Sequence, residues 1–351
     1  MNDIKIGNKF IGNNHPVYIV AEAGCNHDRK LEQGFKLIEE AAKSGADAIK
    51  FQTFKTEKLV TKDSPQWWLP EEQRQNKKQM DLYKTQDIFG YEEYKKLAEH
   101  CEKCRITFLS TPFDEESADL LEKIGVPAYK IASTDLTNLP FLEYVTKKGK
   151  PMIISVGMGS IEEIKETVDT IKNAGNDQII LLHCIVEYPT PMEHANLNFI
   201  KTLQGSFPDC HIGFSDHTLG IVAPIVSASF GAKVIEKHFT IDKTIRGAPD
   251  HIISVDPKEM AILVHDVRAA QASCGSGVRN ILKHEIDAYK FGRRKVVANV
   301  NIPKGTIIER GMLTSKRATG GLDPKHLKYF IGKKSLIDMP EDHILSFDHV
   351  E

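Results

Sequence analysis

Two histidines follow consecutive short apolar runs in the second half of the chain. His217 closes a run that begins at His211, and His238 closes one that begins at Lys233. If the runs are neighbouring parallel strands, their carboxyl ends lie at one edge and the imidazoles are side by side. Imidazole with carboxylate and water suits Mn²⁺, Zn²⁺, Co²⁺ or Fe²⁺ better than Ca²⁺. The pair therefore predicts a divalent-metal site, although either histidine alone would more simply be a hydrogen-bonded strand-end residue.

Lysines and hydroxyl residues end several other apolar runs and would surround the same place. The set is Lys50, Ser110, Thr111, Lys130, Ser133, Ser155 and Ser215. Ammonium and hydroxyl groups together bind phosphate or carboxylate. Any one of these residues alone could be a snorkelling lysine or a turn serine, but the set predicts an anion site beside the histidines.

A Gly/Pro-containing segment, Arg246 to His251, comes soon after the His238 run and contains Asp250. It is equally compatible with a loop over the site and with a plain connection. A longer insertion, Lys55 to Asp87, carries both tryptophans of the chain. Because it exceeds a normal connection, it predicts a lid or substrate-binding loop.

Apolar runs alternate with amphipathic segments through the first three quarters of the chain. The expected strands are Val17–Ala21, Ala46–Phe51, Ile106–Ser110, Ala128–Ala132, Met152–Val156, Ile179–Cys184, His211–Phe214 and Lys233–Glu236. Their continuous apolar character is typical of strands buried on both faces. Eight strand–helix units predict a (β/α)8 TIM barrel. An open doubly wound sheet is less favoured, because catalytic-type residues recur at all the strand ends rather than at one crevice.

The character of the sequence changes after residue 275. We expect a barrel domain over residues 1–275, a polar linker over 276–294 and a small β-rich domain over 295–351. A domain of about 55 residues is marginally stable alone, so docking onto another surface is expected.

Composition excludes several classes of protein. The chain has 351 residues, of which 41% are hydrophobic, and a net charge of −2. With this net charge, the protein as a whole does not attract nucleic acid or an anionic membrane electrostatically. No apolar stretch reaches the length of a membrane span, the N-terminus lacks a signal-peptide pattern, and the six cysteines show no disulfide framework. We therefore expect a cytoplasmic enzyme that binds neither nucleic acid nor membrane.

Short motifs along nearly the whole chain belong to a recognisable pattern. They are Ala21–His27, Ala46–Thr53, Ser110–Phe113, Lys130–Ser133, Ile154–Met158, His183-Cys184, Tyr188–Pro191, Gly213–Thr218 and Glu236–Thr240. Together they resemble the sialic acid synthase family, whose members condense phosphoenolpyruvate with an N-acyl-amino sugar to give a nonulosonic acid. The tail, with Lys316-Arg317 and Gly320–Pro324, resembles the antifreeze-like (SAF) domain that follows these barrels.

The resemblance implies a role for each matching residue. His217 and His238 would bind a divalent metal, Mn²⁺ foremost, with Mg²⁺ or Co²⁺ as alternatives. The residues implied to hold phosphoenolpyruvate are Lys50, Thr111, Lys130, Ser133, Ser155 and Ser215, with Gln52 also among the substrate-binding residues. Glu22, Tyr188 and Asp250 would face the sugar, and Asp135 stands where the family carries an acid, so Glu22 and Asp135 are candidate catalytic carboxylates. Arg317 would reach into the partner's barrel, which implies a domain-swapped homodimer.

Two other functions remain open on the sequence alone. One is a pyruvate aldolase, either with a Schiff base on Lys130 or with a metal, and the other is a non-catalytic carbohydrate-binding protein. The second is disfavoured because a binding module needs neither paired histidines nor a phosphate site. The sugar is not determined, since N-acetylmannosamine, its 6-phosphate and 2,4-diacetamido-6-deoxy sugars differ by a few groups. Val186 replaces a residue that is often polar in the family, which bears on sugar choice.

Overall fold

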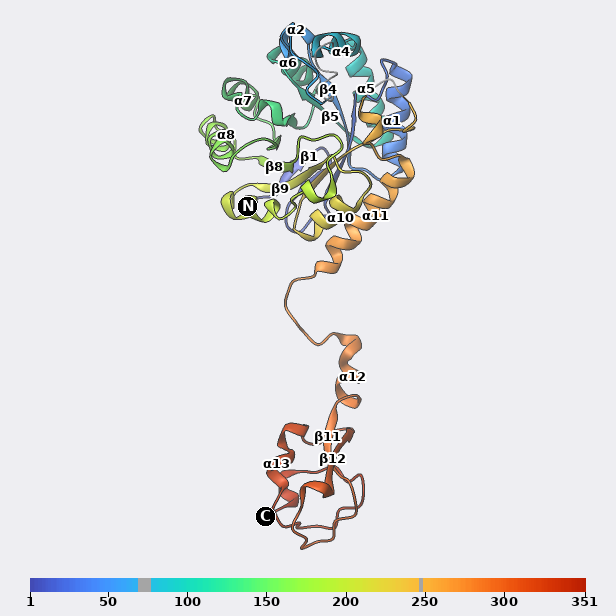
Figure 1. Cartoon of the computed structure of the whole chain (residues 1–351), viewed down its shortest axis with the longest axis vertical. Coiled ribbons are helices and arrows are strands. Elements are labelled where there is room, and N and C mark those ends of the chain that lie inside the picture. Colours follow the sequence, from blue (N-terminus) through green and yellow to red (C-terminus); the bar gives the residue numbers. More distant parts are fainter. Residues whose placement is uncertain (69–76, 246–248) are drawn as a thin grey trace. The chain divides into compact units, whose positions relative to one another are not determined.

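The chain forms two compact units, Met1–Gly275 and Ser276–Glu351. Figure 1 shows the computed structural model, which describes residues 1–68, 77–245 and 249–351. The first unit alternates strands and helices, and the second contains short strands and turns.

The first unit is built on one eight-stranded parallel sheet. Its strands are β3 (Tyr18–Gly24), β4 (Ala48–Thr53), β5 (Thr107–Pro112), β6 (Tyr129–Ile131), β7 (Met152–Ser155), β8 (Ile179–Cys184), β9 (His211–Asp216) and β10 (Val234–His238). The order β5-β4-β3-β10-β9-β8-β7-β6 pairs the first of these strands with the last, as closure requires. The two ends of this order, β5 and β6, lie side by side, but the described residues form no hydrogen-bonded strand pairing between them. The predicted (β/α)8 barrel is confirmed.

Helices follow the strands and cover the outside of the sheet (Figure 1). They are α1 (Leu31–Lys43), α2 (Thr56–Leu59), α4 (Gln79–Gln86), α5 (Tyr91–Cys104), α6 (Glu115–Ile124), α7 (Leu139–Thr146), α8 (Ile161–Asn173), α9 (Phe199–Ser206), α10 (Val222–Ser229) and α11 (Pro257–Cys274). Local signals set their bounds. Asp114, Ser160 and Asp256 accept backbone N–H bonds at the starts of α6, α8 and α11. Gly125, at φ +92°, ends α6 in the left-handed conformation.

Two hydrophobic clusters separate the inside of the barrel from its helical shell. The inner cluster consists of Ile4, Ile6, Ile11, Tyr18, Val20, Ala48, Leu109, Ala128, Ile153, Ile180, Leu182 and Val234. Three of its members come from an N-terminal hairpin, β1 (Ile4–Ile6) and β2 (Lys9–Ile11), which the sequence did not predict. Most of the others lie in the first half of their strands, so the hairpin fills the amino-terminal end of the barrel.

The second unit has a small core of its own. Its regular elements are α12 (Ile286–Phe291), β11 (Arg294–Ala298), β12 (Leu313–Arg317) and α13 (Leu327–Phe330). The strands β11 and β12 pair antiparallel, with Arg294 opposite Arg317. Apolar side chains such as Val296, Ile308 and Phe330 are buried around this hairpin. Across both units, none of the helices in the described part combines the length and apolarity that crossing a membrane requires.

Candidate active site

A ring of buried polar side chains lies directly above the apolar interior of the barrel. Each member is two residues beyond an inward-facing position of its own strand, because successive strand residues point to opposite faces. The ring, called here the polar layer, is Glu22, Lys50, Thr111, Lys130, Ser155, Cys184, Ser215 and Glu236. The pairs Val20 with Glu22 and Val234 with Glu236 show the spacing. The layer lies at the carboxyl ends of the strands, where TIM barrels carry their active sites.

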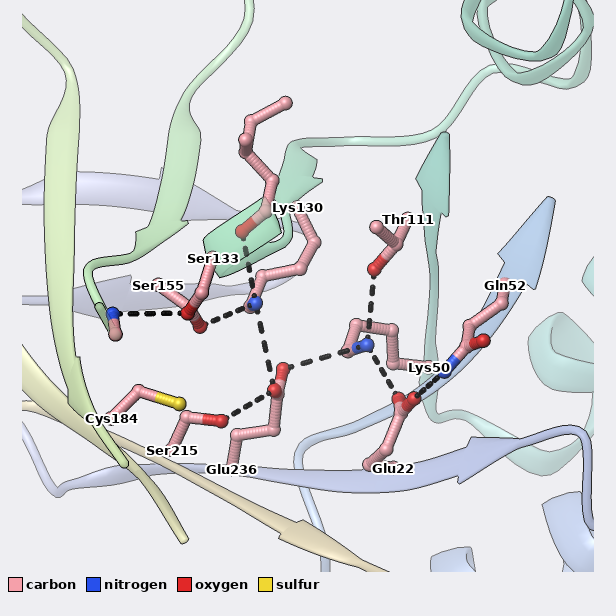
Figure 2. A network of polar contacts seen from close by, with 12 residues as sticks. Glu22, Lys50, Gln52, Thr111, Lys130, Ser133, Ser155, Cys184, Ser215 and Glu236 are labelled. Carbon is pink, nitrogen blue, oxygen red and sulfur yellow. Dashed lines mark hydrogen bonds and ion pairs between the residues drawn. The ribbon is translucent and has the colours of Figure 1, made fainter. Parts of the chain in front are cut away.

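Opposite charges alternate across the middle of the polar layer (Figure 2). Lys50 Nζ lies 2.6 Å from Glu22 Oε2 and 3.8 Å from Glu236 Oε2, and it donates to Thr111 Oγ1 at 3.0 Å. Gln52 Nε2 donates to the other oxygen of Glu22 at 3.0 Å. Lys50 is therefore held between two buried carboxylates.

A second lysine lies next to the other carboxylate oxygen of Glu236 (Figure 2). Lys130 Nζ donates to Ser155 Oγ at 2.7 Å and lies 3.6 Å from Glu236 Oε1. Ser215 Oγ donates to the same carboxylate oxygen at 3.0 Å. Glu236 thus neutralises two buried lysines at once, and it was not among the predicted site residues.

Burial and neighbouring charges shift the pKa of these groups in different directions. Burial raises the pKa of Glu22 to about 7, with Lys50 opposing and Glu236 adding to the rise. Burial also penalises ionised Glu236, but Lys130, Lys50 and the Ser215 hydroxyl outweigh it, so its pKa is lowered. The pKa of Lys130 is lowered by burial despite its contact with Glu236. Two carboxylates with separated pKa values are suited to different proton-transfer roles.

The two predicted histidines lie together at the mouth of the barrel. The ring centroids of His217 and His238 are 5.4 Å apart, and Tyr188 packs on His217 at 4.1 Å. His217 Nδ1 donates to the carbonyl of Ile185 at 2.7 Å, so in the neutral form of this ring Nε2 carries the lone pair. His238 Nδ1 is buried without a hydrogen-bond partner, 3.7 Å from Asp250 Oδ2. Burial, His217 and the nearby lysines hold the pKa of His238 well below its usual range, so this imidazole is neutral.

This pair fits a divalent metal with few protein ligands. Within residues 1–68, 77–245 and 249–351, no group of three or more His, Cys, Asp or Glu side chains is arranged to hold a metal. A neutral imidazole with an unpartnered buried nitrogen, beside a second imidazole fixed through its other nitrogen, is a suitable partial donor set. Substrate and water oxygens would have to complete the coordination.

A buried ion pair on the other face of β9 and β10 supports the strand ends. Lys237 Nζ lies 2.7 Å from Asp216 Oδ2, and both side chains are fully buried. The other oxygen of Asp216 accepts from the backbone N–H of Thr218 at 2.9 Å. Because Asp216 and Lys237 each precede a histidine, this pair fixes the backbone that presents His217 and His238.

One cavity of about 370 Å³ collects nearly all of the predicted site residues. The predicted residues that line it are Glu22, Lys50, Gln52, Thr111, Lys130, Ser133, Ser155, Tyr188, Ser215, His217, His238 and Asp250. Asp135 is not among its lining residues, and its carboxylate accepts from the Asn138 side chain at 3.0 Å. Arg317 belongs to the second unit. The loop residues Arg246, Gly247 and Ala248, and residues 69–76 of the insertion, lie outside the described residues.

The raised pKa of Glu22 predicts how the stability of the protein depends on pH. The unfolded chain releases this proton near the ordinary value of about 4.3, whereas the folded protein holds it to about 7. The resulting contribution to stability is present below the lower value and is lost as the pH rises through about 7. Between about pH 4.5 and about pH 8, the free energy of unfolding of Glu22→Gln should therefore rise by roughly 3 kcal/mol relative to wild type.

Urea unfolding followed by tryptophan emission measures this difference, since both tryptophans lie in the first unit. Glu143→Gln is the matched control, because Glu143 forms an exposed pair with Lys147. If the free energies of unfolding of Glu22→Gln and wild type change equally with pH across this range, Glu22 does not titrate near neutrality.

Comparison with known proteins gives matches over both units. Residues 37–279 match the model of the NeuB family, and residues 293–351 match the SAF domain. An N,N'-diacetyllegionaminic acid synthase of Campylobacter jejuni is 39% identical over 330 residues, 93% of this chain and 98% of the relative. The human N-acetylneuraminate-9-phosphate synthase is 34% identical over 344 residues, 98% of this chain and 95% of the relative. A crystal structure of N-acetylneuraminic acid synthetase from Leptospira borgpetersenii, in complex with citrate, has a TM-score of 0.74 and 36% identity and covers 83% of this chain and 96% of that one.

Proposed function

This chain belongs to the NeuB family, and on that premise we propose that it condenses phosphoenolpyruvate with the open-chain form of an N-acyl-amino hexose. The products are a nonulosonic acid and inorganic phosphate. The observation that supports this reaction best is the pairing, in one cavity, of two buried lysines ringed by hydroxyls with two adjacent imidazoles. The first group suits an anionic enol phosphate, and the second lies beside it where an aldehyde can be held.

Phosphoenolpyruvate carries its charge at two ends, a carboxylate and a phosphate. Lys50 and Lys130 lie next to different oxygens of Glu236, so each can take one anionic end of the substrate. Thr111 and Ser155, which accept hydrogen bonds from these lysines, can donate their hydroxyls to the carboxylate and phosphate oxygens of the substrate. Fixing both ends of phosphoenolpyruvate holds C3 in place for attack on the aldehyde. The reaction between the two substrates then becomes effectively unimolecular, because both are already bound in position.

The bonds that change can be followed through the reaction. C3 of the enol phosphate bonds to the aldehyde carbon, and the aldehyde oxygen takes up a proton to become a hydroxyl. Positive charge left at C2 is offset by Glu22 and Glu236, which flank Lys50. A water oxygen then bonds to C2, with Glu22, whose pKa is about 7, suited to accept its proton. The bond between C2 and the bridging oxygen of the phosphate then breaks, and the new C2 hydroxyl loses its proton, which leaves a ketone at C2 and releases inorganic phosphate.

A divalent metal, Mn²⁺ foremost, is proposed at His217 and His238. When bound, such an ion acts as a Lewis acid toward a carbonyl oxygen. The neutral state of His238 leaves a nitrogen lone pair for it, and His217, once deprotonated, would offer Nε2 as the second donor. Asp250, 3.7 Å from His238 Nδ1, can orient that ring or contact the sugar.

Incubation with phosphoenolpyruvate labelled with ¹⁸O at the bridging oxygen tests this function. With Mn²⁺ and a panel of N-acylated hexoses, the label is expected in the released phosphate, and the organic product should gain three carbons. Release of phosphate with none of the sugars would overturn the proposal. An aldolase that uses Lys130 as a Schiff base, favoured by the lowered pKa of this lysine, would instead be trapped by borohydride in the presence of pyruvate.

We further propose a homodimer in which Arg317 of one chain completes the site of the other. The second unit leaves large apolar side chains such as Ile307, Tyr329 and Phe347 exposed, as a docking surface would. In a one-to-one mixture of inactive Arg317→Ala and His238→Ala proteins, half of the dimers are mixed and each has one intact site, so about a quarter of wild-type activity should return. A mixture that stays inactive after subunit exchange, or a monomer in sedimentation, would contradict the swapped dimer.

A further inference from the structure

Asp250 reaches the cavity from a short turn rather than from a strand of the barrel. It belongs to a 3-10 turn (Pro249–Ile252) beyond the end of β10, and its Oδ2 lies 3.7 Å from His238 Nδ1. A Cβ on Gly24, at the end of β3, would lie 3.4 Å from Asp250 Oδ2 and 3.3 Å from Glu22 Oε1. The carboxylate of Asp250 therefore borders both the polar layer and the histidine pair, and its position depends on what fixes the turn.

The residue after Asp250 is completely buried and holds the turn through both of its ring nitrogens. His251 Nε2 donates to the carboxylate of Asp28 at 3.1 Å, and Nδ1 lies 2.8 Å from Thr240 Oγ1. A carboxylate only accepts hydrogen bonds, so the proton is on Nε2, and Nδ1 of the neutral ring accepts from the Thr240 hydroxyl. Asp28 belongs to the loop after β3, and Thr240 follows β10. One imidazole thus ties the turn to the ends of two neighbouring strands.

A second set of hydrogen bonds fixes the backbone of Asp250. Ser254 Oγ donates to the carbonyl of Asp250 at 2.7 Å, and Asn26 Nδ2 donates to Ser254 Oγ at 3.0 Å. The same amide nitrogen donates to the carbonyl of Phe239 at 2.9 Å, and Asn26 is fully buried. The segment that carries Asp250 is therefore attached to the loop after β3 at two separate points.

The loop after β3 adopts a strained conformation where it makes the first of these contacts. Asp28 and Arg29 have φ values of +48° and +64°, in the left-handed region that residues other than glycine seldom adopt. Such a conformation costs free energy and persists where the surrounding structure holds it, most often at functional sites. Asp28, Thr240 and His251 are all absent from the described lining of the cavity. The strained turn therefore supports a contact behind the cavity rather than one with a substrate.

We propose that Asp28, His251 and Thr240 are positioning residues, which hold the carboxylate of Asp250 on the acceptor side of the site. This inference rests on the proposed condensation, because the sugar aldehyde is the substrate expected beside His238. A turn released from these contacts would let Asp250 move, and a misplacement of about 1 Å can lower a rate by roughly 100-fold. Phosphoenolpyruvate, expected at the two buried lysines, should bind as before.

Thr240→Val and Thr240→Ser form a matched pair for steady-state kinetics, measured with the fastest acceptor of the N-acylated hexose panel. Valine removes the hydroxyl at a similar volume, whereas serine keeps it. Thr240→Val should lower kcat/KM for the acceptor by roughly 10-fold or more, with KM for phosphoenolpyruvate within about twofold of wild type. Thr240→Ser should stay near wild type. His251→Leu, which removes both hydrogen bonds of the ring, should lower kcat/KM further, and Asp28→Asn, which keeps an acceptor for Nε2, should retain most of it.

A double-mutant cycle with Asp250→Ala separates positioning from a general loss of stability. Without the Asp250 side chain there is no carboxylate to hold in place, so adding Thr240→Val should change the remaining kcat/KM by less than about twofold. The unfolding midpoint should still fall by the same amount in both backgrounds, because the hydrogen bond of Thr240 is lost in each. Equal kinetic effects in the two backgrounds would overturn the inference and leave Thr240 a purely structural residue.

Amide hydrogen exchange over residues 249–255 gives a readout without turnover, since the amides of Ile253 and Val255 are hydrogen-bonded there. Exchange in this segment should be faster in Thr240→Val and His251→Leu than in wild type, and Thr240→Ser should match wild type. Unchanged exchange in the first two variants would overturn this inference while leaving the condensation intact. Faster exchange in a protein that releases no phosphate with any acceptor would instead overturn the condensation, and the positioning role with it.

Discussion

The variant His238→Ala will release phosphate from phosphoenolpyruvate about 10³-fold more slowly than wild type, the upper end of what losing one electrostatic stabiliser costs. The reason lies in the state of the imidazole. His238 is buried, neutral and unpartnered at Nδ1, next to His217, so its removal takes away one of two nitrogen donors. The fold should persist, because His238 ends β10 and its ring takes part in no hydrogen bond among the described residues.

The metal content of the purified protein should fall with the rate. Bound Mn²⁺ is counted after dialysis against a limiting concentration of the ion, and thermal unfolding is measured on the same samples. His265→Ala is the matched control, since this histidine is exposed on α11 and should alter neither quantity. A His238→Ala protein with a near-normal rate, or with undiminished metal, would remove this residue from the proposed site.

The variant Glu236→Gln will lose stability as well as activity. Glutamine keeps the shape of the side chain and can still accept from Ser215, but it removes the charge that faces Lys50 and Lys130. Removing one partner of a buried ionic group typically costs 3–5 kcal/mol, because the remaining charge is uncompensated, so a loss of about 3 kcal/mol is expected. We expect kcat to fall by roughly 10²-fold, since charge at C2 loses one of its two flanking carboxylates.

An anion should restore part of the stability lost in this variant. Inorganic phosphate can supply the missing charge to the two lysines, so it should raise the unfolding midpoint of Glu236→Gln more than that of wild type. Glu143→Gln provides the comparison, because exposed ion pairs contribute at most about 1 kcal/mol. If Glu236→Gln unfolds as wild type does, with or without phosphate, Glu236 does not hold the two lysines in the way proposed.

Much of the barrel could be predicted because its strands are short apolar runs separated by amphipathic helices. All eight expected runs overlap strands, and most of the polar residues at their ends line one cavity, whereas Ser110 and Asp135 do not. Glu236 was overlooked because it was treated as part of a strand leading to His238. Counting in steps of two from Val234 would have placed it in the cavity, and the same rule places Lys237 on the outer face.

Other features had no such signal. The hairpin formed by β1 and β2 has strands of three residues, too short for a periodic pattern, and its burial depends on filling the barrel. Asp135 was chosen through the resemblance, whereas its place in a 3-10 turn (Ser133–Asp135) after β6 carries it out of the cavity lining. The rings of Trp67 and Tyr188 lie 6.1 Å apart although the two residues are more than a hundred positions apart in the sequence, and no local pattern links them.

The insertion between β4 and α5 has a consequence for how proteins of this kind diversify. The residues that would take part in bond-making come from the barrel strands, whereas Trp67, Trp68 and Tyr83, whose rings form a chain of contacts leading to Tyr188, come from this one insertion. Substitutions there would change the lining of the cavity without removing any member of the ion pairs between Lys50, Lys130, Glu22 and Glu236. We expect related chains to keep the residues carried by the strands while the length and sequence of this insertion vary.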